Sequence, residues 1–160
     1  MKMILTILMI LILGILFYQD LKERKISLWI LVIGIIIGGI IHYLHQYLMV
    51  FLWNIFINTA FIMLLFGVLW SYAKLKMKKK IFDVFGLGDL LFFILLAVSL
   101  PMLSFLIVFI FSLLFSLITF ILLKNTFTDK TVPLAGLQSL FFGLVLMGNT
   151  AFSSINLYAL

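Results

Sequence analysis

The sequence predicts an all-α polytopic membrane protein with six transmembrane helices and both termini outside. Three observations lead to this prediction. Of the 160 residues, 66% are hydrophobic and 10% are charged, whereas a soluble domain carries about a quarter charged residues. The hydrophobic residues form successive runs that approach the length of about 20 residues needed to cross a membrane. The basic residues lie almost entirely in alternate connections between these runs.

The connections between the runs are short, so we expect residues 1–160 to form a single transmembrane domain. The first run resembles a signal peptide, but no small-x-small cleavage site follows it, and we expect it to be retained. The apolar stretch 84–123 is too long for one helix, and Pro101 is a natural break in it. The predicted spans are approximately 3–19, 27–44, 48–72, 84–100, 102–123 and 133–157.

The positive charges predict the orientation of the protein, because Lys and Arg accumulate in cytoplasmic loops. Of the 11 basic residues, all except Lys2 lie between spans one and two, three and four, or five and six. These connections are therefore expected in the cytoplasm, where the clusters would contact anionic membrane lipid and not nucleic acid. The acidic residues fall on the same side: Asp20, Glu23, Asp83, Asp89 and Asp129.

Several chemistries are excluded or disfavoured by the residues present. The chain has no cysteine, which excludes a thiolate nucleophile, a disulfide framework and a cysteine-ligated metal. His42 and His45 lie at an outer connection that carries no acid, so we expect neither a metal site nor Ser/His/Asp chemistry there. Asn54 and Asn58 are expected to make interhelical hydrogen bonds. No cofactor is predicted.

Two aspartates are the candidate catalytic pair. A fourth span beginning after Asp89 and ending before Pro101 would be about 15 Å long, half the hydrocarbon thickness of about 30 Å. The span must therefore include 84–88, which places Asp89 below the membrane surface. Asp20 ends the short first span at the same side. Ionisable groups at such a depth are a functional hypothesis by default, and two facing carboxylates can share a proton and activate water.

Two glycines precede Asp89 in the segment "FGLGD". Gly86 and Gly88 remove side chains beside the carboxylate, which would let an extended substrate backbone approach. A structural alternative is open for each acid. Asp89 is well placed to cap the following helix, and Asp20, in "DLKERK", could be a solvated loop residue.

These residues resemble the type IV prepilin peptidases, which are GxGD aspartic proteases. The first family motif is similar to "QDLKERKIS", the second to "GLGD" at 86–89, and the segment after the last cytoplasmic loop to "TVPLAGLQSL" with Pro133. The resemblance implies that Asp20 and Asp89 form the catalytic dyad. It implies a hydrolase of the cell membrane that cleaves leaders from prepilins or pilin-like secretion proteins at the cytoplasmic face. The connection after Asp20 is too short for the N-methylation domain of full-length members.

Alternative functions remain open at this stage. The family's usual proline and lysine are replaced by Ser27 and Leu91, so a catalytically degenerate relative is one alternative. Preflagellin peptidases share the six-span plan, and presenilin-like proteases share Gly-Leu-Gly-Asp. A small transporter or an assembly subunit is the non-enzymatic alternative, although a transporter would be expected to place polar groups near the midplane. The substrate and the oligomeric state are not predicted.

Overall fold

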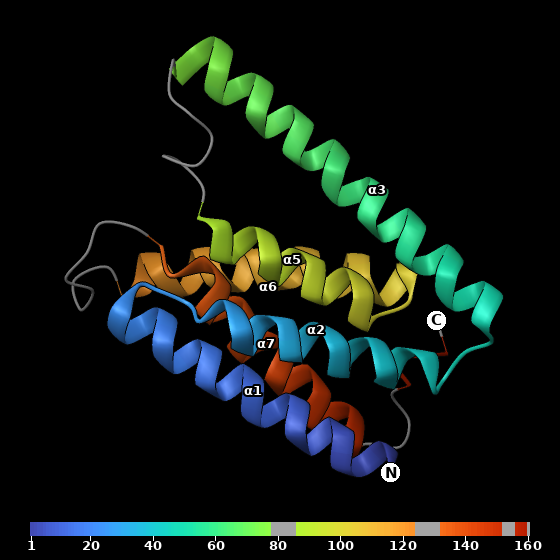
Figure 1. Ribbon diagram of the computed structural model, residues 1–160. Helices are drawn as coiled ribbons and strands as arrows, with labels where there is room; N and C mark the ends of the chain where they lie inside the picture. Colours follow the sequence, from blue (N-terminus) through green and yellow to red (C-terminus); the bar gives the residue numbers. More distant parts are fainter. Residues whose placement is uncertain (78–85, 124–131, 152–155, 160) are drawn as a thin grey trace.

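The computed structural model describes residues 1–77, 86–123, 132–151 and 156–159, and in these ranges it contains helices but no strand. The all-α prediction is therefore confirmed. Within these ranges the chain forms six α-helices, and a π-helical turn, η1 (Ala73–Met77), extends the third (Figure 1). The α-helices are α1 (Lys2–Glu23), α2 (Leu28–Tyr43), α3 (Leu48–Tyr72), α5 (Leu87–Ser99), α6 (Met102–Leu122) and α7 (Leu134–Ala151).

In the described part of the chain, four helices are long and apolar enough to cross a membrane: α1, α3 with its extension to Lys76, α6 and α7. The helices α2 and α5 are apolar but shorter, with 16 and 13 residues. At about 1.5 Å per residue, α5 is about 20 Å long. Pro101 ends it as predicted, because Leu100 before the proline is extended and α6 begins at Met102. The crossing of the membrane by α2 and α5 stays a prediction.

The helices pack as a bundle in which α3 is the outermost element. The helix α1 packs against α7 and α2, α2 packs against α5, and α7 packs against α6. By contrast, α3 contacts the bundle mainly near its beginning and diverges from α5 toward its end (Figure 1). Its buried residues are Asn54, Asn58 and Ile62, whereas side chains such as Met63 and Val68 are exposed.

Small residues bring α2 and α5 together. Gly34 and Gly38 lie four residues apart on one face of α2, an arrangement that allows close approach of membrane helices. A Cβ at Gly34 would lie 2.8 Å from Leu95 Cδ1, and a Cβ at Gly38 would overlap the Ser99 hydroxyl. We call this close contact of Gly34 and Gly38 with α5 the α2–α5 seam. The seam holds α5, and with it Asp89, against the rest of the bundle.

We expect the substitution Gly38→Ala to destabilise the protein by about 1–3 kcal/mol, because overpacking forces side chains and backbone apart. A lower midpoint of thermal unfolding in detergent would show this effect. Gly14→Ala is the control, because a Cβ at Gly14 meets no atom within 4 Å. Equal midpoints for the two variants would show that the seam is not tightly packed.

A polar network closes the end of the bundle that contains the last turn of α2. Asn58 Nδ2 donates to the carbonyl oxygens of Ala97 and Leu100, both at 2.9 Å, and so satisfies the end of α5. Asn54 Nδ2 donates to Gln46 Oε1 at 2.7 Å. The two asparagines thus make interhelical and loop contacts, as predicted from their place in the third span.

The histidines belong to the same network. His42 is fully buried and its Nδ1 donates to the Val98 carbonyl oxygen at 2.9 Å. His45 donates from Nδ1 to the Ile41 carbonyl oxygen at 2.8 Å and stacks on the Tyr158 ring, with centroids 4.3 Å apart. Both rings are held by protein atoms, which gives them a structural role at this end.

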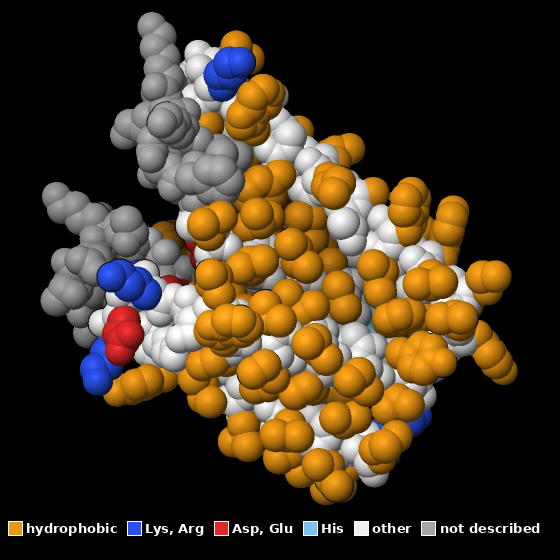
Figure 2. All heavy atoms as spheres, in the orientation of Figure 1, with side chains coloured by type: hydrophobic (Ala, Val, Ile, Leu, Met, Phe, Trp, Pro, Cys, Tyr) orange, Lys and Arg blue, Asp and Glu red, His pale blue; other side chains and the backbone are white. Residues whose placement is uncertain are grey.

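The surface of the bundle is predominantly apolar (Figure 2). Large hydrophobic side chains such as Trp29, Phe56 and Ile121 are exposed on several helices, as expected for a protein whose solvent is lipid. In Figure 2, Lys and Arg side chains lie at the end of α1 and, separately, at the end of α3. Lys2 begins α1 and is therefore at the opposite end of that helix. The remaining predicted loop charges lie outside the described residues: Lys78, Lys79, Lys80, Asp83, Lys124, Asp129 and Lys130.

Candidate active site

Asp20 lies on the buried face of α1, in its last turn. Leu13, Leu16 and Asp20 are spaced by three and four residues, so they share one side of the helix. Leu13 and Leu16 are in the core, and Asp20 itself is only 8% exposed. The carboxylate therefore continues the apolar stripe of α1 into the bundle. This position argues against the alternative in which Asp20 is a solvated loop residue.

Asp89 lies in the first turn of α5 and is half-buried. The residue at the N-cap of α5 is Gly86, and Asp89 is the third residue of the helix. Asp89 precedes the buried residues Phe92 and Phe93 by three and four positions, which directs its side chain to the same inner face. Its carboxylate also interacts with the backbone N–H of Gly86.

The beginning of α7 holds both carboxylates. The backbone N–H of Ala135 donates to Asp89 Oδ1 at 3.0 Å, and the backbone N–H of Gly136 donates to Asp20 Oδ2 at 2.6 Å. The first N–H groups of a helix have no partner within it, and the helix dipole favours negative charge there. Consecutive backbone nitrogens are no more than about 3.8 Å apart, so with hydrogen bonds of 3.0 and 2.6 Å the two bound oxygens are no more than about 9.4 Å apart.

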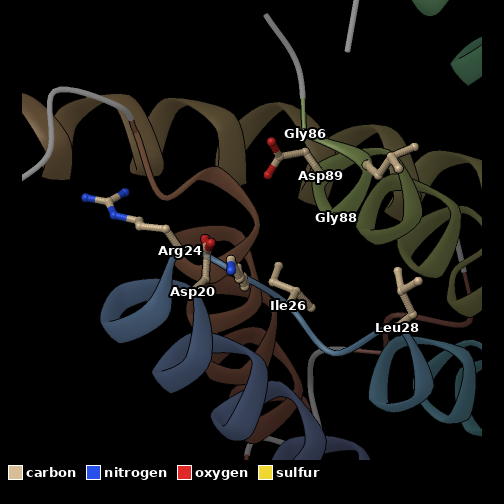
Figure 3. A pocket seen from close by; sticks show the side chains of 9 residues that line it. Asp20, Arg24, Ile26, Leu28, Gly86, Gly88 and Asp89 are labelled. Atoms are coloured by element: carbon tan, nitrogen blue, oxygen red, sulfur yellow. The ribbon is translucent and has the colours of Figure 1, made fainter. Parts of the chain in front are cut away.

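A pocket of about 370 Å³ opens beside the two aspartates. Figure 3 shows Asp89 and Gly86 on one side of it and Asp20 and Arg24 on the other. Its lining combines two carboxylates, two basic residues, two glycines and three aliphatic side chains: Asp20, Asp89, Arg24, Lys25, Gly86, Gly88, Ile26, Leu28 and Leu87. A pocket of this size and mixed character suits a short segment of extended peptide.

The two predicted glycines both line this pocket, and each has a specific neighbour. A Cβ at Gly86 would lie 3.1 Å from Asp89 Oδ2, and a Cβ at Gly88 would lie 3.2 Å from Ile26 Cδ1. The space beside Gly88 is therefore occupied by a side chain of the α1–α2 connection. Gly86 leaves the Asp89 carboxylate uncovered on the pocket side.

The α1–α2 connection is short and fixed by backbone conformation. Arg24, at the end of α1, has the left-handed backbone conformation with φ of 52°. The helix stops there and the chain changes direction. Gln19 Oε1 then accepts a hydrogen bond from the Ser27 backbone N–H at 3.1 Å. This turn places Arg24 and Ile26 in the wall of the pocket and gives the Asp20 carboxylate a cationic neighbour.

Sequence reasoning missed the backbone groups of Ala135 and Gly136, although it singled out Pro133. Pro133 is buried outside the pocket lining, and its carbonyl oxygen accepts from the Leu137 N–H at 3.0 Å. It starts the turn that carries the two amides. A proline followed by small residues at the beginning of a span, as in "PLAGL", is the sequence signal for such a closely approached helix terminus.

These features define the class of protein. It is an apolar helical membrane protein in which two aspartates from different helices meet at one helix N-terminus, beside a pocket open for a ligand. Residues 7–122 match the family model described as "Type IV leader peptidase family". The chain belongs to the type IV leader peptidase family, and the resemblance inferred from the motifs is confirmed.

The matched residues contain both aspartates and the Gly86–Asp89 segment, whereas α7 lies beyond them. At the family level the chain is a peptidase-like hydrolase of the membrane. A comparison with curated proteins finds no match, and a comparison with solved structures finds none either.

Proposed function

We propose that this protein is a membrane-embedded aspartic endopeptidase that removes the leader from type IV prepilins or pilin-like proteins. Asp20 and Asp89 are the proposed catalytic pair. The single observation that carries the proposal is that consecutive amides of α7 bind one oxygen of each carboxylate. Family membership supports the peptidase class.

The geometry suits general acid–base hydrolysis. Two neighbouring carboxylates resist double ionisation, so the pair holds one proton between them. The ionised member takes a proton from water, whose oxygen bonds to the scissile carbonyl carbon, while the other member donates its proton to the carbonyl oxygen. The protonated member of the pair then gives its proton to the leaving nitrogen, the ionised member takes a proton from a hydroxyl of the tetrahedral intermediate, and the C–N bond breaks. The products are an acid and an amine, and the pair again holds one proton.

The orientation is part of the proposal. The basic residues that line the pocket, Arg24 and Lys25, would face the cytoplasm by the positive-inside rule, and the pocket would lie at the cytoplasmic boundary of the cell membrane. A leader entering from the cytoplasm would then reach the aspartates without crossing the bilayer.

Purified protein in lipid vesicles is expected to cut a pilin-like precursor into two fragments. Mass spectrometry of the products should locate the cut at the boundary between the leader and the following apolar helix, and show the addition of one water molecule in total. A precursor that binds to the vesicles and remains intact would support a degenerate relative or an assembly subunit and would overturn the proposal.

A further inference from the structure

One buried polar side chain of α7, a turn beyond the amides that bind the two aspartates, has no hydrogen-bond partner among the described residues. Gln138 on α7 is 0% exposed, and neither its Nε2 nor its Oε1 makes a hydrogen bond within the described part of the chain. Buried side-chain amides are normally hydrogen-bonded, and each exception calls for an explanation. The neighbouring buried hydroxyl follows the rule, because Ser139 Oγ donates to the Gly136 carbonyl oxygen at 2.7 Å.

The place of Gln138 in the helix relates it to the two aspartates. Gln138 follows Ala135 by three residues, so the two positions lie on the same face in consecutive turns. Ala135 is the residue whose N–H binds Asp89. Side chains of a helix lean toward its N-terminus, and the Gln138 amide is therefore directed back toward the turn that holds the carboxylates.

Hydrolysis by the two aspartates needs a water molecule held between them. Each cleaved bond consumes one water molecule, and a water molecule occupies a protein interior only where it finds two or more polar partners. The backbone amides of Ala135 and Gly136 are already used by the aspartates. The remaining partners for a water molecule at the aspartates are the other carboxylate oxygens, the basic side chains of Arg24 and Lys25, and any buried polar group that reaches the pair. A primary amide supplies both a donor and an acceptor.

We propose that Gln138 is a positioning residue that holds the water used by Asp20 and Asp89. The inference rests on the proposed function and adds a residue to it. Gln138 orients the oxygen of the water between the carboxylates and does not itself exchange a proton. This role would explain why its buried amide has no partner among the described protein atoms.

The absence of native cysteine allows a test that does not depend on activity. A cysteine that water reaches ionises and reacts with a small thiol reagent, whereas a cysteine in dry apolar surroundings is inert. We expect Gln138→Cys in vesicles to be modified by methyl methanethiosulfonate. Phe142→Cys, at an equally buried site one turn deeper on the same face, should remain unmodified. Equal labelling of the two variants, or none at Gln138→Cys, would overturn the inference.

A kinetic experiment separates a positioning role of Gln138 from a purely structural role. Gln138→Leu should lower kcat at least about 10-fold with KM changed less than threefold, and the thermal midpoint should stay the same or rise because an unpartnered amide is lost. Ser112→Ala, which removes a buried hydroxyl bonded within α6, should leave kcat within twofold. A wild-type kcat in Gln138→Leu, or a large fall in its thermal midpoint, would overturn the inference.

The two proposals fail in different ways. If wild-type protein leaves the precursor intact, or if Asp20→Asn and Asp89→Asn variants cut it normally, the proposed function fails. The labelling of Gln138→Cys against Phe142→Cys still decides whether water reaches this position. If the aspartate variants are inactive and Gln138→Leu is fully active, the inference about Gln138 alone is wrong.

Discussion

Replacing Asp20 or Asp89 with asparagine is expected to lower the rate of precursor cleavage at least about 100-fold, because each carboxylate has a separate proton-transfer task. The two single variants and the double variant should be similarly inactive, since residues that act as a unit have non-additive effects. The measurement is the initial rate of precursor cleavage in vesicles, at equal amounts of each protein.

Asparagine is the informative substitution because it preserves the contacts with α7. Its carbonyl oxygen can still accept the hydrogen bond from the Ala135 or Gly136 N–H, so the variants should fold and enter the membrane at normal levels. Only the capacity to gain and lose a proton disappears. Loss of cleavage with an unchanged thermal midpoint would therefore report chemistry and not misfolding.

Glu23→Gln is a matched control for these variants. Glu23 is an exposed acid in the last turn of α1, three residues from Asp20, and it does not line the pocket. This variant should keep cleavage within twofold of wild type. Normal cleavage by either aspartate variant would contradict the dyad, and an equal loss in Glu23→Gln would point to a general effect of charge at this end.

A second large fall in cleavage rate is expected when Gly136, which has no reactive side chain, is replaced. In Gly136→Ala, the new Cβ would lie 2.8 Å from both Cβ and Oδ2 of Asp20, closer than real Cβ contacts allow. Asp20 must move away from the α7 amide. We expect a loss of stability of about 1–3 kcal/mol from overpacking. We also expect a fall in cleavage rate of about 100-fold, the cost associated with misplacing a reacting group by about 1 Å.

Gly148→Ala separates this clash from the general effect of replacing glycine in α7. A Cβ at Gly148 meets no atom within 4 Å, and alanine stabilises a helix interior by about 0.5–1 kcal/mol relative to glycine. The control should therefore be as stable as wild type or more stable, with unchanged cleavage. If Gly136→Ala behaves like Gly148→Ala in both measurements, α7 does not set the position of Asp20.

Much of the helical architecture could be predicted because a long apolar run of a chain in lipid must form a helix. The predicted break at Pro101 separates α5 from α6, and the predicted span 27–44 corresponds to α2 at Leu28–Tyr43. The predicted last span, 133–157, contains α7 at Leu134–Ala151 and reaches the turn formed by residues 156–159. Apolar residues continue into this turn because Leu157 and Tyr158 are buried against the bundle, so composition alone could not separate helix from packed turn.

The sequence by itself determined the all-α membrane class, the family and the candidate pair, because apolar runs must become helices in lipid and because two acids near such runs are rare. Only the tertiary structure decided what holds the pair together. The partners of Asp20 and Asp89 are backbone amides of Ala135 and Gly136, which carry no side-chain signature. Likewise, the space beside Gly88 is filled by Ile26. Contacts made by backbone atoms between distant segments depend on how the helices pack, and packing is a property of the folded chain.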